Sequence, residues 1–253
     1  MTGSKNIIIQ PRDVRLLRTV ALLRAIDRVQ AAQIGDFKSI TRVNTTLLRL
    51  VKAGLLNRFF MGVGPGTQKA IYTVTAKGAA VAAVPYRRFR RRNNALYSGD
   101  LFLEHQLLLN DIYLFLQKLQ PGVLVQNWKT FEKPLPQSSV IPDAYCELIF
   151  NNLVKPVFFE VDKNTESRKT WKKKTASYLS FALTGLFEKE FHQQQFRTLA
   201  ITVNEQQLRR IQTAISGQTS KVFWLATFDD IKNEGFLAAI WRRPNSSERF
   251  PFF

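Results

Sequence analysis

The sequence predicts an α+β protein with two domains, and three observations support this. The first 80 or so residues contain three apolar patterns at helical spacing, followed by two β-prone runs joined by a Gly-rich turn. Residues 141–178 contain two further β-prone runs and then a long helical pattern, and strand and helix patterns alternate after that. With 253 residues, 45% of them hydrophobic, the chain can form two cores. We predict domains at 1–85 and 96–253, joined by an Arg-rich linker at 86–95.

The N-terminal domain is predicted to contain three helices and a β-hairpin. Pro11 suits the first turn of the first helix, and Gly54 stands where a left-handed residue would end the third. The loop 62–66 is rich in glycine and is predicted to be the tip of the hairpin. The expected helices are 11–28, 31–34 and 39–53, the strands are 55–60 and 70–74, and a short helix at 75–81 closes the domain.

This order of elements resembles a winged helix-turn-helix domain, with 39–53 as its recognition helix. The polar face of that helix carries residue types that suit a major groove, because Arg can bridge guanine, Asn can bridge adenine, and Thr and Lys can hold phosphates. The alternative is a solvated helix face or a protein contact. The candidate DNA-binding residues are Arg42, Asn44, Thr45, Thr46, Arg49 and Lys52, with Arg58 and Lys69 at the ends of the hairpin.

The chain is strongly basic, with a formal net charge of +18 at pH 7, which indicates a polyanionic partner. DNA is the leading candidate. The predicted linker concentrates five further candidate DNA-binding residues, which could follow a phosphate backbone or enter a narrow minor groove. A merely solvated linker is the alternative. These residues are Arg87, Arg88, Arg90, Arg91 and Arg92.

The second domain is predicted to be an α/β core around a central mixed sheet, because strands and helices alternate in its second half. A Pro- and Ser-rich loop at 133–142 leads into its central hairpin. The expected strands are 123–131, 144–150, 154–161, 197–203 and 221–227, and the expected helices are 100–119, 167–186, 205–216 and a last one from 229 to about 241.

Acidic residues gather around the central hairpin of this domain. Asp143 follows Pro142, and Glu160 and Asp162 come at the end of the next strand. Period-2 alternation places Glu160 and Asp162 on the same side of that strand, so both carboxylates can face one site. Like charges at short distance resist joint ionisation, and a divalent metal is the usual remedy. The alternative is a turn at Pro142-Asp143 and a solvated strand end.

An acid after Pro, a hairpin, a Glu at a strand end and then a basic helix together resemble the PD-(D/E)XK nuclease core, which is restriction-endonuclease-like. The stretch from Phe159 to Glu166, behind a helix-turn-helix, resembles the replication-relaxation family of plasmids and mobile elements. The resemblance implies Mg²⁺ or Mn²⁺ bound by Asp143 and Glu160, with Glu104 as a third ligand. The implied catalytic residues are Asp143, Glu160, Asp162, Lys163 and Lys174, and Lys172 and Lys173 would contact DNA.

One position departs from the nuclease pattern, since Asp162 stands where that pattern has Lys. Lys163 follows directly but points to the opposite face of a regular strand. Lys174 and Tyr178 form a K-x-x-x-Y pair one helical turn apart, which could supply the missing lysine. Two functions remain open: a Mg²⁺-dependent nickase or endonuclease, or a non-catalytic accessory factor or transcriptional regulator with a degenerate nuclease fold. A relaxase, a replication initiator and a second copy of the chain are candidate partners.

Several classes of function are not supported by the sequence. The single cysteine, Cys146, excludes an internal disulfide and a cysteine-cluster zinc site, and we expect it to be a buried, inert thiol. Two histidines leave little room for a catalytic triad, and no P-loop or dinucleotide fingerprint occurs. No run is long enough to span a membrane, and the N-terminus does not resemble a signal peptide. We therefore expect a cytoplasmic protein associated with the nucleoid or a plasmid.

Overall fold

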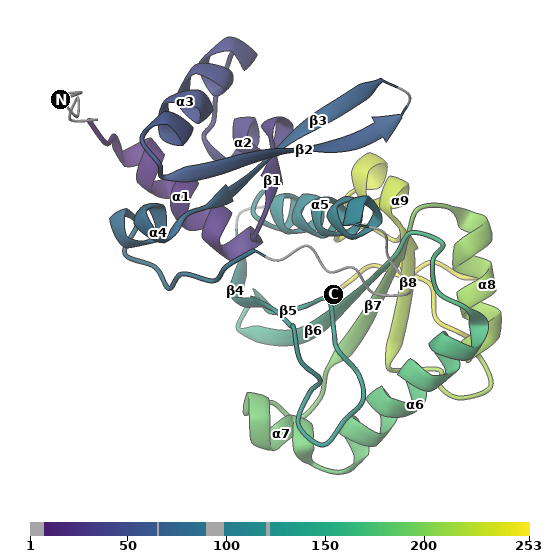
Figure 1. Cartoon of the computed structure of the whole chain (residues 1–253). Coiled ribbons are helices and arrows are strands. Elements are labelled where there is room, and N and C mark those ends of the chain that lie inside the picture. The colour runs from purple at the N-terminus through teal and green to yellow at the C-terminus, as the bar shows by residue number, and fades with distance from the viewer. Residues whose placement is uncertain (1–7, 65, 90–98, 120–121) are drawn as a thin grey trace. The chain divides into compact units, whose positions relative to one another are not determined.

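The computed structural model describes residues 8–64, 66–89, 99–119 and 122–253 (Figure 1). The protein is α+β, as the sequence predicts. It divides into two compact units, Met1–Leu114 and Phe115–Phe253, and each is considered by itself. The division falls within helix α5 (Gly99–Leu116), whereas the sequence places a boundary at 86–95. Residues 90–95 of that predicted linker lie outside the described residues.

Three helices form the start of the first unit: α1 (Pro11–Leu23), α2 (Arg28–Ile34) and α3 (Ile40–Lys52). The predicted third helix is confirmed, but the predicted first helix is too long. Arg24 has a φ of 72°, which ends α1, and the chain then forms the short strand β1 (Ile26–Asp27). The apolar positions of α1 and α3 that sit at helical spacing are buried in one core.

The β-hairpin of the first unit is longer than predicted and consists of β2 (Leu56–Gly64) and β3 (Thr67–Val74). Strand β1 pairs with the other side of β3, so the antiparallel sheet has the order β1-β3-β2. Gly54 has a φ of +70°, as expected for the left-handed residue after α3. Helix α4 (Ala76–Val81) follows the hairpin. Three helices followed by a hairpin and a short helix is the order that the sequence predicts for this part of the chain.

Helix α5 is held to the first unit by buried polar side chains. Gln30 Nε2 donates to the carbonyl of Leu107 at 2.8 Å and to Asp111 Oδ1 at 2.7 Å. Asn110 Nδ2 donates to the carbonyl of Ala25 at 2.6 Å. Leu114 belongs to the same apolar core as α1 and α3. These contacts explain why the division of the chain falls after Leu114.

The second unit contains a five-stranded mixed sheet with the order β4-β5-β6-β7-β8. Strands β4, β5 and β6 pair antiparallel in that order, whereas β7 pairs parallel with β6 and β8 pairs parallel with β7. Parallel neighbours need crossover connections, and helices provide them here. The strands are β4 (Val123–Thr130), β5 (Ala144–Phe150), β6 (Leu153–Asp162), β7 (Arg197–Thr202) and β8 (Phe223–Thr227).

The helices of the second unit are α6 (Arg168–Leu183), α7 (Leu186–Phe191), α8 (Glu205–Ile215) and α9 (Phe228–Glu234). The single helix predicted at 167–186 is therefore wrong at its end, because Gly185 takes a left-handed conformation with a φ of 72° and separates α6 from α7. Helix α9 is also shorter than predicted. The chain after it forms bridges from Arg242 to Leu225 of β8 and from Trp241 to Phe250.

Helices α6, α7 and α8 cover one face of the five-stranded sheet (Figure 1). Phe158 of β6 is fully buried at the centre of this face, among aromatic side chains from β5, α6 and α7. Two residues further along the same face of β6 comes Glu160, beneath α6. The core therefore places one carboxylate under a helix. Cys146 lies on β5 and is buried, and burial raises the pKa of its thiol well above the ordinary value.

Candidate functional site

The end of β6 and the start of α6 build the candidate site. The carboxylate of Asp162 organises the turn between them: its Oδ1 accepts hydrogen bonds from the backbone N–H of Thr165 at 2.9 Å and of Glu166 at 3.4 Å. The side chain of Ser167 then accepts from the N–H of Thr170 and caps α6. This turn orients α6 so that the helix face with Lys174 and Tyr178 lies against β6.

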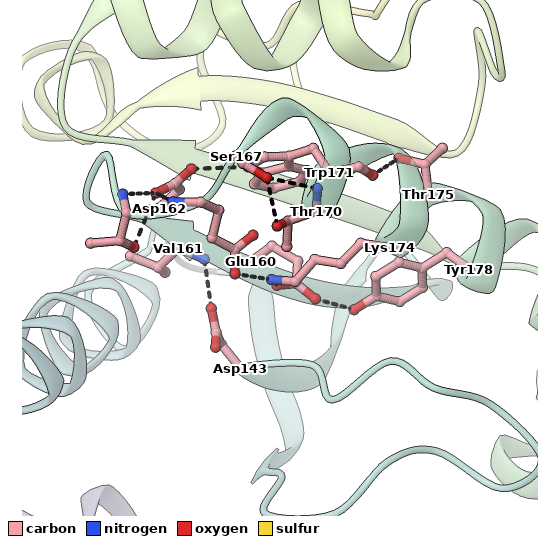
Figure 2. A network of polar contacts seen from close by, with 12 residues as sticks. Asp143, Glu160, Val161, Asp162, Ser167, Thr170, Trp171, Lys174, Thr175 and Tyr178 are labelled. Atoms are coloured by element: carbon pink, nitrogen blue, oxygen red, sulfur yellow. Dashed lines mark hydrogen bonds and ion pairs between the residues drawn. The ribbon is translucent and has the colours of Figure 1, made fainter. Parts of the chain in front are cut away.

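Glu160 lies at the centre of the site and is fully buried. Lys174 Nζ is 2.6 Å from Glu160 Oε2, and the hydroxyl of Tyr178 donates to Glu160 Oε1 at 2.6 Å (Figure 2). Both carboxylate oxygens of Glu160 thus have a donor from α6. The two donors are one helical turn apart, which is the spacing that lets them share one partner.

Two more carboxylates surround the ammonium group of Lys174. Glu166 Oε1 accepts from Lys174 Nζ at 2.7 Å. Asp143 Oδ2 accepts from the backbone N–H of Val161 at 2.7 Å, which holds its carboxylate beside the end of β6 (Figure 2). We call this group of five residues the Lys174 cluster; it consists of Asp143, Glu160, Glu166, Lys174 and Tyr178.

Burial and neighbouring charges shift the pKa values within the Lys174 cluster. Burial raises the pKa of Glu160 to about 7, because the loss of solvation outweighs the favourable charge of Lys174, and Asp143 and Glu166 raise it further. Burial also raises the pKa of Glu166 above its ordinary value despite Lys174. Burial alone would lower the pKa of Lys174, but Glu160, Glu166 and Asp143 hold it well above its ordinary value. Lys174 is therefore a permanent cation at neutral pH.

Asp162 lies on the same face of β6 as Glu160, as predicted, but its carboxylate has different partners. Asp162 Oδ2 accepts from Trp171 Nε1 at 2.9 Å and from Gln207 Nε2 at 2.6 Å. Asp162 is buried, and with the two turn amides its carboxylate is held by neutral donors from α6, α8 and the turn. We infer that Asp162 positions α6 and α8 against the strand. Lys163 follows it and is half-buried.

Helix α3 presents part of the predicted DNA-binding face to solvent. Arg42, Thr45 and Lys52 are exposed, while Asn44 and Thr46 are half-buried. These five side chains come from one helix whose opposite face, formed by Val43, Leu47 and Leu50, is buried in the core of the first unit. The geometry is that of a helix with one free polar face.

Three other predicted DNA-binding side chains of the first unit already have partners within it. Arg49 NH2 contacts both carboxylate oxygens of Asp13 at 2.6 and 2.7 Å, which ties α3 to α1. Lys69 Nζ lies 3.1 Å from Asp27 Oδ2. Arg58 is exposed and lies over the ring of Phe60, 5.4 Å from its centroid. Arg49 in particular stabilises the unit, because its partner Asp13 is buried.

The remaining predicted DNA-binding residues lie elsewhere. Arg87 and Arg88 are exposed, whereas Arg90, Arg91 and Arg92 lie outside the described residues. Lys172 and Lys173 are exposed on α6, on the side away from the sheet. Basic side chains are therefore available in both units.

The comparison with protein-family models gives one match, to the replication-relaxation family, over residues 17–193. This match spans more than half of the chain and includes α2, α3, the hairpin and the Lys174 cluster. The chain belongs to the replication-relaxation family. The resemblance inferred from the sequence is thus confirmed at the level of the family.

Other comparisons add little about this member of the replication-relaxation family. No curated protein matches its sequence. A crystal structure of protein VC1899 from Vibrio cholerae is 12% identical to it, with a TM-score of 0.27, over 90% of this chain and 56% of that chain. This likeness is too low to support an argument about fold or function. No helix in the described part of the chain is long and apolar enough to cross a membrane.

The metal site implied by the nuclease resemblance does not fit this arrangement of side chains. Both oxygens of Glu160 accept from Lys174 and Tyr178, and the ammonium group of Lys174 already supplies a counter-charge to this carboxylate. Asp143 Oδ2 already accepts from the backbone N–H of Val161, and Glu104 is half-buried on α5. Among the described residues, no group of three or more His, Cys, Asp and Glu side chains could hold a metal ion.

Sequence reasoning missed the role of Glu166. Its carboxylate binds Lys174, and Ser167, immediately after it, caps α6. The available signal was its spacing from Lys174. Glu166 is eight residues before Lys174, and the turn that precedes α6 can bring its side chain beside the second turn of that helix. The K-x-x-x-Y pair, by contrast, is brought to Glu160 as its spacing suggests.

Proposed function

We propose that this replication-relaxation protein binds DNA through the exposed face of α3 during replication or relaxation of a plasmid or mobile element. The observation that carries the proposal is the free polar face of α3 within a helix-turn-helix and hairpin arrangement. The net charge of +18 supports a polyanionic partner. Arg42 and Lys52, near opposite ends of α3, are the leading contacts, because both are exposed.

Replacing Arg42 with alanine should weaken DNA binding. If Arg42 contacts a base edge, the loss is about 1–3 kcal/mol of binding free energy. Fluorescence anisotropy with duplexes selected from a randomised pool by the wild-type protein measures it. Arg15→Ala is the matched control, since Arg15 is an exposed arginine on a different helix, α1. Equal affinity of Arg42→Ala and Arg15→Ala would contradict the assignment of α3.

Arg49→Ala should behave differently from Arg42→Ala in the same assay. Its partner Asp13 is buried, so loss of Arg49 should lower the stability of the first unit. Thermal unfolding of both variants separates a side chain that binds DNA from one that supports the helix.

For the second unit, the non-catalytic alternative agrees better with the geometry than metal-dependent cleavage does. The observation that favours it is the ion pair between Glu160 and Lys174, which supplies the counter-charge that a metal would otherwise provide. The position that carries Lys in the nuclease pattern is Asp162, which instead holds Trp171 and Gln207. We propose that this unit acts as a scaffold for DNA or for a partner such as a relaxase or replication initiator.

The cleavage alternative has its own support, since Asp143, Glu160 and Lys174 do converge. Supercoiled plasmid incubated with the protein in Mg²⁺ or Mn²⁺ distinguishes the two. We expect bound plasmid to stay supercoiled on agarose gels after phenol extraction. Nicked or linear product that disappears in both Asp143→Asn and Glu160→Gln, and persists in the control Glu248→Gln, would instead establish a nuclease site.

A further inference from the structure

The solvent-facing sides of α6 and α8 carry an unusual concentration of positive charge. Six exposed cations lie on these two helices, and we call them the α6–α8 basic surface; they are Arg168, Lys169, Lys172, Lys173, Arg209 and Arg210. The sequence of α6, Arg168–Leu183, contains no acidic residue. Helix α8 contains one, Glu205, which already pairs with Arg209 and Arg242.

The two helices present one continuous surface. Both pack their apolar sides on the same face of the five-stranded sheet, and they lie against each other (Figure 1). Arg210 NH1 is 3.4 Å from Asn164 Oδ1 in the turn just before α6, which places Arg210 near the N-terminal end of that helix. The cations of α8 therefore adjoin those of α6.

The placement of these charges is unfavourable for the stability of α6. Arg168 and Lys172, and likewise Lys169 and Lys173, are like charges four residues apart on one helix face, where they repel each other. Arg168 and Lys169 also lie in the first turn of the helix, where the macrodipole favours negative charge. Such a pattern opposes folding unless a polyanion compensates it. Function is a better account of it than stability.

We propose that the α6–α8 basic surface binds the phosphate backbone of DNA, as a second contact besides α3. This second contact rests on the proposed function, that the protein binds DNA, but it uses residues of the second unit, whereas α3 belongs to the first. Lysines spaced along a helix hold phosphates as point charges without reading base sequence. The contact should therefore be independent of sequence and strongly weakened by salt.

The test compares two double variants with the same net charge in the full-length protein. Lys169→Gln with Lys173→Gln removes two charges from α6 and keeps helix propensity. Lys133→Gln with Lys221→Gln removes two exposed charges from elsewhere in the second unit. We expect the first to weaken binding to a random-sequence duplex on the order of tenfold and to reduce the salt slope by nearly two, and the second to change neither.

Thermal unfolding supplies the second measurement. Because the substitutions in α6 relieve repulsion, the melting temperature of that variant should be unchanged or higher while its DNA affinity falls. Equal affinities of the two double variants would overturn the proposal. A lower melting temperature of the α6 variant together with its lower affinity would also overturn it, because unfolding would then explain the weaker binding. The DNA affinity of Arg42→Ala, measured in the same titration, reports separately on α3. The proposal for the α6–α8 basic surface can therefore be contradicted without contradicting the proposal for α3, and the reverse.

Discussion

Replacing Lys174 with methionine is expected to lower the free energy of unfolding by about 3–5 kcal/mol at pH 8, because it removes one partner from a buried ion pair. Lys174 Nζ is 2.6 Å from Glu160 Oε2 and 2.7 Å from Glu166 Oε1, and Glu160 is fully buried. Without the ammonium group, the Glu160 carboxylate is left with Tyr178 as its donor. Urea unfolding followed by tryptophan fluorescence measures the loss.

Three comparisons make this expectation specific to the ion pair. Lys173→Met changes the exposed neighbouring lysine and should have little effect on stability. Combining Lys174→Met with Glu160→Gln should recover part of the loss, since the fully buried carboxylate is then neutral while Glu166 still lacks its lysine partner. The penalty for Lys174→Met should also shrink as pH falls, because Glu160 can take up a proton. A loss that is the same in the double variant would mean that the pair with Glu160 contributes nothing to the penalty.

The helix-facing half of the Lys174 cluster could be predicted from the sequence. Alternation along β6 places Glu160 on one face, and the i, i+4 spacing of Lys174 and Tyr178 places both on one side of α6. The strand and helix that carry them are confirmed to within a few residues. Local periodicity is enough here because each element is long and has a continuous buried face.

Other features depend on contacts that periodicity does not reveal. The partners of Asp162 come from both α6 and α8, and Gln207 is 45 positions away. The polar contacts of Gln30 and Asn110 join segments 77 to 85 residues apart, and they draw α5 into the first unit. The break at Gly185 was missed because one glycine in an amphipathic run is compatible with a continuous helix. Such details are set by tertiary packing.

The pH dependence of stability should carry the signature of Glu160. Its pKa is about 7 in the folded protein, against an ordinary value of 4.5. Between these two values the folded state binds more protons at Glu160 than the unfolded state does, so the free energy of unfolding falls as pH rises. The full change from this residue is on the order of 3 kcal/mol. The raised pKa of Glu166 acts in the same direction.

Other shifted groups act outside this window. The pKa of Asp230 is lowered from 3.8, chiefly by hydrogen bonds from Thr227 that outweigh its burial, so it contributes stability that is lost only as pH falls below that region. The pKa of Lys174 is held well above 10.5, so the stability that its ammonium group contributes is lost only when that group deprotonates at alkaline pH. A decline in stability between about pH 4.5 and 7 should therefore report mainly on the Lys174 cluster.

Urea unfolding at half-unit steps from pH 4.5 to 8 tests this expectation. We expect the wild-type free energy of unfolding to decline over this range and Glu160→Gln to remove most of the slope, because glutamine does not titrate. Glu248→Gln changes an exposed acid and should keep the wild-type slope. A wild-type stability that rises with pH instead would mean that Lys174 outweighs burial and keeps Glu160 ionised throughout. In that case the cluster is a fully charged pair in the wild-type protein, and the penalty for Lys174→Met should still shrink as pH falls, because the unpaired Glu160 of the variant can take up a proton.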